Sequence, residues 1–290
     1  MTDLLCADPW CCNAGDVATS LATANGLAER GVPVRRVSSF QGNRTIIGGG
    51  DLVGEHAHGH IYRVPGSHIL NAVGVRSEPG DLSYLQDYQL LSARDHVAAE
   101  RITDQVDRPV DVVPCPATLI QPAPWELACS VPRWGLLQHL GDYVVIHARP
   151  ELSGFANGAR NMQVIAIEPA PYTWTPWESH GWLLPATHSP ELIAAVLSRA
   201  KAVITLSLHM SILALAVGTP FCCPNRGNDQ QQEKLRNYWT RSGIPEVIYA
   251  GTHPVQHARS LAARQREVRH SEILAANEHL DHIAKIIVPQ

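Results

Sequence analysis

The feature that most constrains the fold is a regular alternation of short aliphatic runs with helical stretches. Residues 34–38, 69–75 and 110–113 are typical of buried strands, and residues 16–30 are typical of a helix that ends at Gly31. Strands that alternate with helices predict α/β units with mostly parallel sheets. The 290 residues are enough for about two such domains.

A proline-rich stretch between residues 114 and 132 interrupts the alternation, which begins again at residue 143. Proline lacks a backbone donor and continues neither a strand ladder nor a helix, so we expect a linker there. We predict a Rossmann-like domain over residues 1–132, a second over residues 133–270, and a C-terminal helix over residues 271–290 that could return to the first domain. Ligands of open α/β sheets bind beyond the carboxyl ends of the strands, so the predicted active site is a central cleft between the domains.

Charge and hydropathy exclude several classes of protein. There are 23 basic and 27 acidic residues and no long basic block, so we expect no nucleic-acid partner. The first ten residues lack the basic and apolar segments of a secretory signal. The most apolar long stretch, residues 202–224, is broken by polar residues, glycine and proline, which favours a buried strand–helix–strand over a membrane span.

Cysteine and histidine patterns predict neither a disulfide framework nor a metal centre. The seven cysteines include two neighbouring pairs and show no paired CxxC spacing, which indicates reduced thiols in the cytoplasm. His56, His58 and His60 would share one face of a strand and could hold a metal. Nearby glycines favour a loop instead, and no carboxylate pair or cysteine cluster completes a site, so we predict no metal and no cofactor.

Two loops of the first half follow strands, where a ligand would bind. Residues 11–16 (Cys-Cys-Asn-Ala-Gly-Asp) precede the first helix, and their small side chains allow a ligand to approach the helix N-terminus. The alternative is that Asp16 simply caps the helix. Residues 48–51 (Gly-Gly-Gly-Asp) mark a tight turn or a close backbone approach, but neither GxGxxG nor a Walker lysine is present, so the nucleotide fingerprint is absent.

Two arginines also follow predicted strands. Arg94 could bind a carboxylate or phosphate, or could form a local pair with Asp95 at a helix start. Arg149 follows His147 at the end of the first strand after the linker, and its planar fork matches carboxylate or phosphate oxygens. The alternative for this pair is a surface arginine beside a buried histidine.

The strongest signal is the strand and apolar helix over residues 202–217, whose first helical turn carries Ser207 and His209. Ser207 fits a helix cap, and His209 lies at the positive end of the helix dipole, where an imidazole can donate to an anion or transfer a proton. The alternative is a core histidine bonded to backbone.

A polar loop follows the next strand. Its residues Arg226, Gln230 and Lys234 are suited to the phosphate or sugar of a donor substrate. The alternative is a solvated loop that opens a helix.

Four of these stretches together resemble the polysaccharide pyruvyl transferase family. They are Asn-Ala-Gly-Asp at residues 13–16, the glycine turn with its preceding isoleucines at residues 46–51, Leu-Ser-Ala-Arg-Asp at residues 91–95 and Leu-His at residues 208–209. Their order and spacing match, and they cover most of the chain. The resemblance implies a GT-B-like α/β fold of two Rossmann-like domains. It also implies transfer of the enolpyruvyl group of phosphoenolpyruvate to a sugar, which gives a pyruvate ketal and phosphate.

The resemblance also implies roles for residues. It makes His209 the acid/base or phosphate ligand and Arg149 the arginine that grips the donor, and it turns the loops at residues 13–16 and 48–51 toward the acceptor. The family pattern Arg-Leu-His is Ser-Leu-His here, so Arg226 or Lys234 would have to replace the missing cation.

We therefore predict three groups of site residues. The catalytic group is His209, Asp16 and Asp51. The donor-binding group is Arg149, His147, Ser207, Arg226, Gln230, Lys234 and Arg94. The acceptor-binding group is Asn13, Gly15, Gly49 and Gly50.

Two other functions stay open at this point. Residues 206–224, followed by Asp-Gln-Gln, are similar to the donor half of GT-B glycosyltransferases, and the absence of an Asp-x-Asp motif agrees with metal-independent transfer from a nucleotide sugar. The change at Ser207 also allows a non-catalytic binding relative. Expected partners are phosphoenolpyruvate or a nucleotide-sugar donor and a glycan or lipid-linked glycan acceptor, with peripheral membrane association and a homo-oligomer both open.

Overall fold

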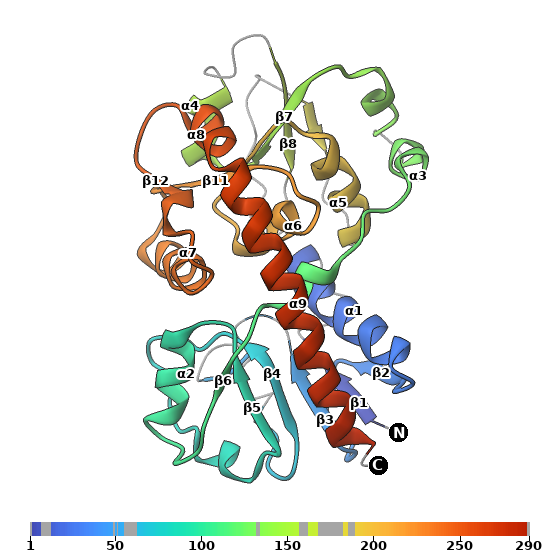
Figure 1. The fold of residues 1–290 in the computed structure, drawn as a ribbon, viewed down its shortest axis with the longest axis vertical. Helices are drawn as coiled ribbons and strands as arrows, with labels where there is room; N and C mark the ends of the chain where they lie inside the picture. The colour runs from blue at the N-terminus through green and yellow to red at the C-terminus, as the bar shows by residue number, and fades with distance from the viewer. Residues whose placement is uncertain are drawn as a thin grey trace. The chain divides into compact units, whose positions relative to one another are not determined.

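The computed structural model of the chain describes residues 2–6, 13–48, 50, 52–54, 63–131, 134–156, 162–167, 182–184 and 189–288. The chain forms two compact units. The first comprises Met1–Cys11, Asp16–Leu119 and Glu272–Gln290, and the second comprises Cys12–Gly15 and Ile120–Ser271. Each unit is built around a parallel sheet (Figure 1), which confirms the predicted α/β class.

The first unit contains a six-stranded parallel sheet in the order β2–β1–β3–β4–β5–β6. Its strands are β1 (Thr2–Leu5), β2 (Val34–Val37), β3 (Thr45–Gly48), β4 (Ile69–Val73), β5 (Leu90–Ala93) and β6 (Asp111–Val112). Its helical segments are α1 (Ala14–Glu29), η2 (Ser83–Asp87), α2 (His96–Thr103), η3 (Pro116–Leu119) and the end of α9 (Ala262–Ile287). The strands and the helix predicted for this half are confirmed, with ends shifted by a residue or two.

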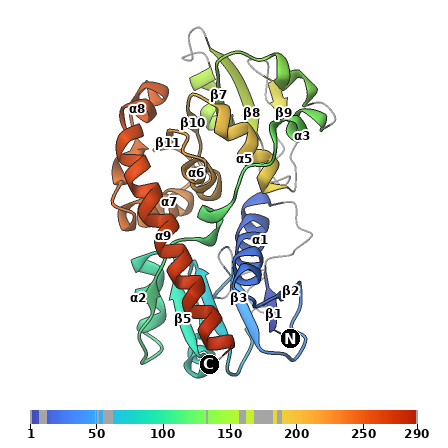
Figure 2. The same cartoon turned by 45° about the vertical axis from the view of Figure 1, so that its right-hand side comes forward.

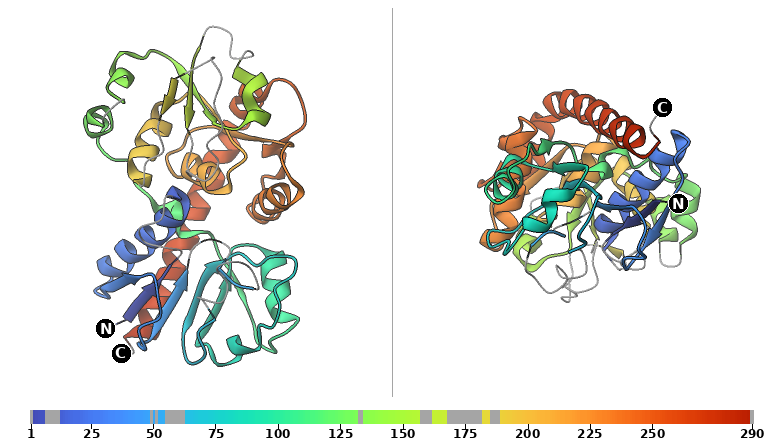
Figure 3. Two further views of the ribbon diagram at one scale, coloured as in Figure 1. Left: turned by 180° about the vertical axis from the view of Figure 1, so that it is seen from behind. Right: turned by 90° about the horizontal axis from the view of Figure 1, so that it is seen from below.

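Four strands of this sheet each contain a doublet, that is, two neighbouring apolar residues such as Leu4 and Leu5. Successive side chains of a strand point to opposite faces, so each doublet contributes one apolar side chain to each face of the sheet. One residue of each doublet joins a cluster with α1 and the end of α9, formed by Leu4, Leu27, Ile46, Ile69, Leu90, Leu280 and Ile283. The other joins a cluster with α2 that includes Leu5, Ile47, Leu70, Leu91 and Ile102. Figures 2 and 3 show α1 and the last turns of α9 along the same side of the sheet.

The second unit contains another six-stranded parallel sheet, in the order β12–β11–β10–β7–β8–β9. Its strands are β7 (Tyr143–His147), β8 (Gln163–Ile167), β9 (Trp182–Leu184), β10 (Val203–Ile204), β11 (Phe221–Pro224) and β12 (Ile248–Tyr249). Its helices are α3 (Trp125–Ser130), α4 (Ser153–Ala156), α5 (Pro190–Arg199), α6 (Leu208–Ala216), α7 (Asp229–Arg241) and α8 (Pro254–Ser260). Short 3₁₀ turns lie at Gly135–His139, Pro150–Leu152 and Pro245–Val247.

Both faces of the second sheet are covered as well. Val255 and Ala258 of α8 pack with Ile146 and Ile204 on one face, and the Tyr143 hydroxyl donates a hydrogen bond to a carbonyl of α5 on the other (2.6 Å). β9 has three residues; such a short run shows no sequence period, and this strand was not predicted. Among the described residues, no helix combines the length and the hydropathy needed to cross a bilayer.

The two units divide after Leu119, earlier than the boundary predicted after residue 132. The later prolines of the stretch lead into α3, which packs on α5 of the second unit. The Arg199 guanidinium lies over the Trp125 ring, 4.3 Å from its centroid. This contact draws the second part of the proline-rich stretch into the second unit.

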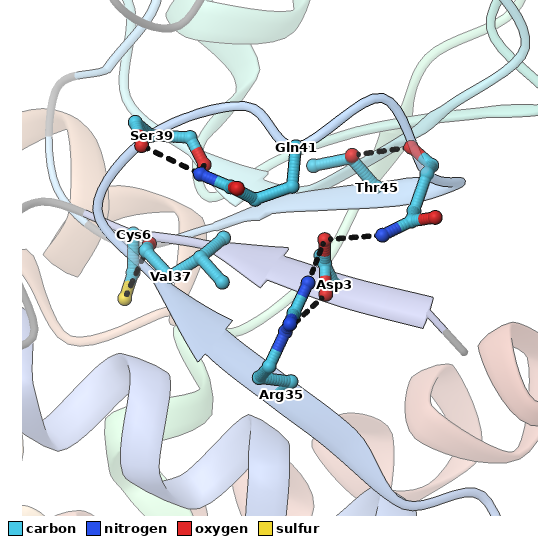
Figure 4. A network of polar contacts seen from close by, with 8 residues as sticks. Asp3, Cys6, Arg35, Val37, Ser39, Gln41 and Thr45 are labelled. Atoms are coloured by element: carbon cyan, nitrogen blue, oxygen red, sulfur yellow. Dashed lines mark hydrogen bonds and ion pairs between the residues drawn. The ribbon is translucent and has the colours of Figure 1, made fainter.

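A buried carboxylate, Asp3 of β1, ties the first strand to β2 and to the turn before β3 (Figure 4). Arg35 donates two hydrogen bonds to it, through Nε and Nη2, and Asn43 Nδ2 donates a third, each 3.0 Å long. The Asp3 side chain has no exposed surface, whereas that of Arg35 is 51% exposed. Burial alone would raise the pKa of Asp3, but the hydrogen bonds and the charge of Arg35 outweigh it and hold the pKa below its ordinary 3.8.

The arrangement of helices around the first sheet also depends on a second polar network, at the end of α9. His279 Nε2 lies 3.1 Å from Asn71 Oδ1 of β4 and 3.1 Å from Ser92 Oγ of β5. Asn71 Nδ2 in turn donates to Thr23 Oγ1 of α1 (3.1 Å). All four side chains are buried. Burial lowers the pKa of His279 to about 4, and the nearby His282 adds to the shift.

We predict that Asp3→Asn destabilises the first unit at neutral pH but not in acid. Loss of the charged hydrogen bonds should lower the free energy of unfolding by about 1–2 kcal/mol at pH 7, because the half-exposed Arg35 remains solvated. The depressed pKa means that this stabilisation is full above about pH 4 and is lost as the pH falls through the folded-state value. Urea unfolding at pH 7 and pH 3 measures the difference. Asp142→Asn, which removes an exposed ion pair with Lys201, serves as the control, and equal losses for Asp3→Asn at both pH values would contradict the assignment.

We predict a second pH dependence, caused by His279. Its folded-state pKa of about 4 lies below its ordinary 6.5, so the unfolded chain binds the proton more readily. The free energy of unfolding should therefore be full above pH 6.5 and fall by up to about 3 kcal/mol as the pH drops toward 4. His279→Gln should remove this part of the pH dependence, and His270→Gln, at an exposed position of α9, should not. Identical pH profiles for the two variants would refute the prediction.

Candidate functional site

The predicted donor-binding residues of the second unit follow adjacent strands of one parallel sheet. β10 pairs in parallel with β7 on one side and with β11 on the other. The three strands therefore end at the same edge, where their connecting loops begin. This edge carries His147 at the end of β7 and Arg149 after it, Ser207 and His209 after β10, and Arg226 after β11.

Helix α6 starts at this edge because Ser207 caps it, as predicted. The Ser207 hydroxyl accepts a hydrogen bond from Met210 N (3.3 Å), and Ser207 N donates to the buried Thr205 hydroxyl (2.9 Å). Every residue of α6 is buried except His209. The one partly exposed side chain of this helix is thus the residue predicted to act as acid/base.

His209 packs directly on the first turn of α1. A Cβ atom placed on Gly15 would lie 2.2 Å from His209 Nδ1, so only glycine leaves room for the imidazole. Asn13 Oδ1 accepts a hydrogen bond from Gly15 N (3.0 Å) and so supports this turn. Gly15 belongs to the second unit, like His209, so this contact lies within that unit. The start of α6 carries partial positive charge, which favours an anion beside His209.

Two arginines on the same edge are held differently. Arg226 lies over the Phe155 ring, with its guanidinium carbon 4.8 Å from the ring centroid, and it is exposed. Arg149 is partly exposed, but its Nε is buried and makes no hydrogen bond to any described residue. His147 beside it has 2% of its surface exposed. Arg149 therefore retains donor capacity for an anionic ligand.

Helix α7 begins just after Arg226 and carries the remaining predicted donor residues. Asn228 caps the helix, since its Oδ1 accepts a hydrogen bond from Gln231 N (2.9 Å). Gln230 is exposed and Lys234 is partly buried. The loop that bears Arg226 therefore leads into the capped first turn of α7.

One residue of this region, Gln232, was not predicted. Its side chain is 4% exposed, and its Nε2 donates to Pro224 O (3.2 Å) and to Arg226 O. Gln232 thus fixes the backbone of the loop that carries Arg226. It shares the buried face of α7 with Leu235 and Trp239, at positions i+3 and i+7, and this spacing is the signal that could have identified it.

In the first unit, Asp16 and Gly50 lie together, as expected for the loops assigned to the acceptor. Gly50 has a φ of +68°, which favours glycine, and a Cβ placed on it would lie 2.8 Å from Asp16 Oδ1. Asp16 is in the first turn of α1, where a carboxylate interacts favourably with the helix dipole. The closeness of Asp16 to Gly50 agrees with a role in a site. Its place in the first turn of α1 agrees equally with the alternative, a carboxylate that stabilises the start of a helix.

Arg94 lies in the first unit, whereas the other predicted donor-binding residues lie in the second. It is 4% exposed, and its Nε lies 4.0 Å from Asp95 Oδ2. Asp95 caps α2 by accepting a hydrogen bond from Ala98 N (2.8 Å). Burial raises the pKa of the nearby Cys115 thiol. The positive charge of Arg94 lowers this pKa, and the negative charge of Asp16 raises it.

Several predicted residues lie outside the described part of the chain. These are Gly49, Asp51, His56, His58 and His60. In the part that is described, no three His, Cys, Asp or Glu side chains are grouped so that they could hold a metal ion.

We predict that Gly15→Ala disturbs His209. A methyl group there would collide with the imidazole and should lower the free energy of unfolding by about 1–3 kcal/mol, although alanine is the better helix former. The double variant Gly15→Ala/His209→Gly should recover most of that loss in thermal unfolding; glycine is needed at position 209 because His209 Cβ would itself lie 2.4 Å from the new methyl group. Gly154→Ala, on a short helix with open space around the new methyl group, is the control. Additive losses in the double variant would show that the two residues do not touch.

Comparison with known proteins places the chain in a family. The model of the polysaccharide pyruvyl transferase family matches residues 13–226. No curated protein matches the chain in sequence. Among solved structures, a protein from Listeria monocytogenes described as a UDP-N-acetylglucosamine 2-epimerase is 12% identical, with 99% of this chain and 96% of that chain covered and a TM-score of 0.56. WaaG, a glycosyltransferase involved in lipopolysaccharide biosynthesis, is 10% identical, with full coverage of both chains and a TM-score of 0.54.

Identities this low show the fold alone. The fold is α/β and GT-B-like, with two parallel sheets and a helical C-terminal region, as predicted. The family match covers most of the chain, including the loops at residues 13–16 and 48–51 and the edge of the second sheet up to Arg226. The chain belongs to the polysaccharide pyruvyl transferase family.

Proposed function

We propose that the protein transfers a pyruvyl group from phosphoenolpyruvate to hydroxyls of a glycan and forms a pyruvate ketal. The observation that carries the proposal is His209, which lies at the start of α6 on the sheet edge that also bears Arg149, Arg226 and the start of α7. Phosphoenolpyruvate has two anionic groups, a carboxylate and a phosphate. An edge with two helix starts and two arginines is suited to such a dianion.

The reaction requires two proton transfers. Two sugar hydroxyls each form a bond to C2 of the pyruvyl group, the bond from C2 to the phosphate oxygen breaks, and the enol double bond is converted to a methyl group. One hydroxyl proton ends on C3 and the other on the released phosphate. His209 is our proton donor at C3 or at the leaving phosphate, a role in which a histidine contributes typically 10²–10⁴-fold.

The remaining roles follow the charges of the residues. Arg149 and Arg226 neutralise the carboxylate and the phosphate of the donor. Arg226 takes the place of the family arginine that is Ser207 in this chain, supported by its stacking on Phe155. On the acceptor side, Asp16 or Asp51 orients or deprotonates the sugar hydroxyl.

A glycosyltransferase that uses a nucleotide-sugar donor is the second candidate. The capped start of α7, with Gln230 and Gln231 in its first turn, and the fold shared with a glycosyltransferase favour it. In that case the same helix starts and arginines would stabilise the leaving diphosphate without a metal. A third candidate, a non-catalytic binding relative, would hold the same anions without turnover.

Partners and location follow from the chemistry of either transfer. The acceptor is a glycan or a lipid-linked glycan, and a lipid-linked acceptor would bring the protein to a membrane surface. We place the protein in the cytoplasm, in keeping with its cysteines, since none of those in the described residues is in a disulfide. A homo-oligomer is compatible with each of these assignments.

Phosphate release from phosphoenolpyruvate, measured with a panel of glycan acceptors, tests the proposed function. We expect release that depends on the acceptor, and a fall of about 10²-fold or more in His209→Ala. His270→Ala, an exposed histidine on α9, is the matched control and should keep full activity.

Calorimetry with phosphoenolpyruvate and with uridine nucleotides identifies the donor without knowledge of the acceptor. Tight binding of phosphoenolpyruvate that weakens in Arg149→Ala and Arg226→Ala is the expected result. Nucleotide-sugar turnover with no phosphate release from phosphoenolpyruvate would replace the proposal by the glycosyltransferase. Binding without any turnover would favour the non-catalytic relative.

A further inference from the structure

Strand β4 of the first unit contains one extra residue beside β5. Leu70 pairs with Leu91 and Val73 with Ala93, so the register shifts between them. Ala72, within this irregularity, has a φ of +50° and is the only non-glycine residue with a positive φ in the described part of the chain. It is 1% exposed. A buried alanine in the left-handed region is strained, and such strain persists only where the surroundings impose it.

The Ser92 hydroxyl of β5 closes the gap that the extra residue leaves in the ladder. Ser92 Oγ accepts a hydrogen bond from Ala72 N (2.9 Å) and donates one to Leu70 O (2.8 Å). The hydroxyl thus bonds to backbone groups on both sides of the irregularity. One hydroxyl therefore stabilises the strained conformation from both sides.

His279 of α9 supports this arrangement. Its Nε2 lies 3.1 Å from Ser92 Oγ and 3.1 Å from Asn71 Oδ1. Asn71 precedes Ala72 in β4, and it approaches β3 so closely that a Cβ on Gly48 would lie 3.1 Å from Asn71 Nδ2. The imidazole thus holds the two polar side chains that flank the strained residue.

The two residues directly after Ala72 form backbone hydrogen bonds with two loops that carry predicted site residues, the loop of Gly50 and the loop of Arg94. Gly74 N donates a hydrogen bond to Gly50 O (3.0 Å), and Arg94 N donates one to Val73 O (3.0 Å). The backbone positions of Gly50 and Arg94 therefore depend on the conformation at Ala72.

We propose that Ser92 and His279 are positioning residues: they hold the strained turn at Ala72, and this turn places Gly50 and Arg94 for the reaction. A purely structural contact would not need a strained alanine, because regular pairing of β4 with β5 satisfies the same backbone groups. The catalytic part of this inference rests on the proposed function, whereas the positional part does not.

Ser92→Ala tests the inference, with Ser20→Ala as the matched control. Ser20 is a buried serine of the same unit whose hydroxyl donates to Val17 O within α1 (3.1 Å). In Ser92→Ala we expect the amides of Gly74 and Arg94 to exchange with solvent about tenfold faster than in the wild type, because the groups around Ala72 lose their partner. We also expect phosphate release to fall about tenfold well below the melting temperature of the variant.

Addition of Ala72→Gly to Ser92→Ala should bring exchange and activity part of the way back toward the wild-type values, because glycine adopts this φ without strain but does not replace the two hydrogen bonds of the Ser92 hydroxyl. If Ser92→Ala does not fold, His279→Gln and His279→Leu replace it. Glutamine keeps an N–H donor toward Ser92 and Asn71, so only the leucine variant should speed the exchange.

Wild-type exchange at Gly74 and Arg94 in Ser92→Ala would overturn the inference, as would equal exchange in the two His279 variants. Faster exchange with unchanged phosphate release would overturn its catalytic part. If the wild-type protein releases no phosphate from phosphoenolpyruvate, the proposed function fails, and the exchange rates alone decide whether Ser92 and His279 hold the turn.

Discussion

Burial of both faces of each parallel sheet is the constraint on which the rest of this structure depends. A strand covered on both sides has no solvent-facing row, so its residues must be apolar in pairs, as in β1, β3, β4 and β5. Polar side chains are then placed beyond the strand ends or hydrogen-bonded inside. Asp3, Asn71 and Ser92 are interior examples, and each has hydrogen-bond partners on a neighbouring element.

The same constraint explains which parts of the fold and of the candidate site could be predicted from the sequence alone. Short aliphatic runs are visible in the sequence, and they made most of the strands and the residues after them predictable, while the alternation of these runs with helices indicated parallel sheets. The caps were predictable too, since Ser207 and Asp95 satisfy helix N–H groups a few residues away. Family membership followed from the order of the same loops.

What could not be predicted depends on residues far apart in the chain. The sequence Ile-Leu-Asn-Ala-Val of β4 contains no glycine, and the Ser92 hydroxyl that bonds to Ala72 N comes from another strand and contacts His279 of a distant helix. Likewise, nothing near Gly15 indicates that its missing side chain makes room for His209. The boundary between the units lies after Leu119 and not after residue 132, again because of a distant contact. Trp125, in the proline-rich stretch, packs on Arg199 of the second unit.

The first unit is discontinuous, and this has a consequence for the order in which the protein can fold. Its sheet and α1 lie within the first 119 residues, yet Leu280 and Ile283, which cover one face of that sheet, lie near the C-terminus. During synthesis the whole second unit emerges before these residues do. The part of the protein that is made first therefore completes its core last, and its apolar face must stay uncovered or be shielded until α9 has left the ribosome.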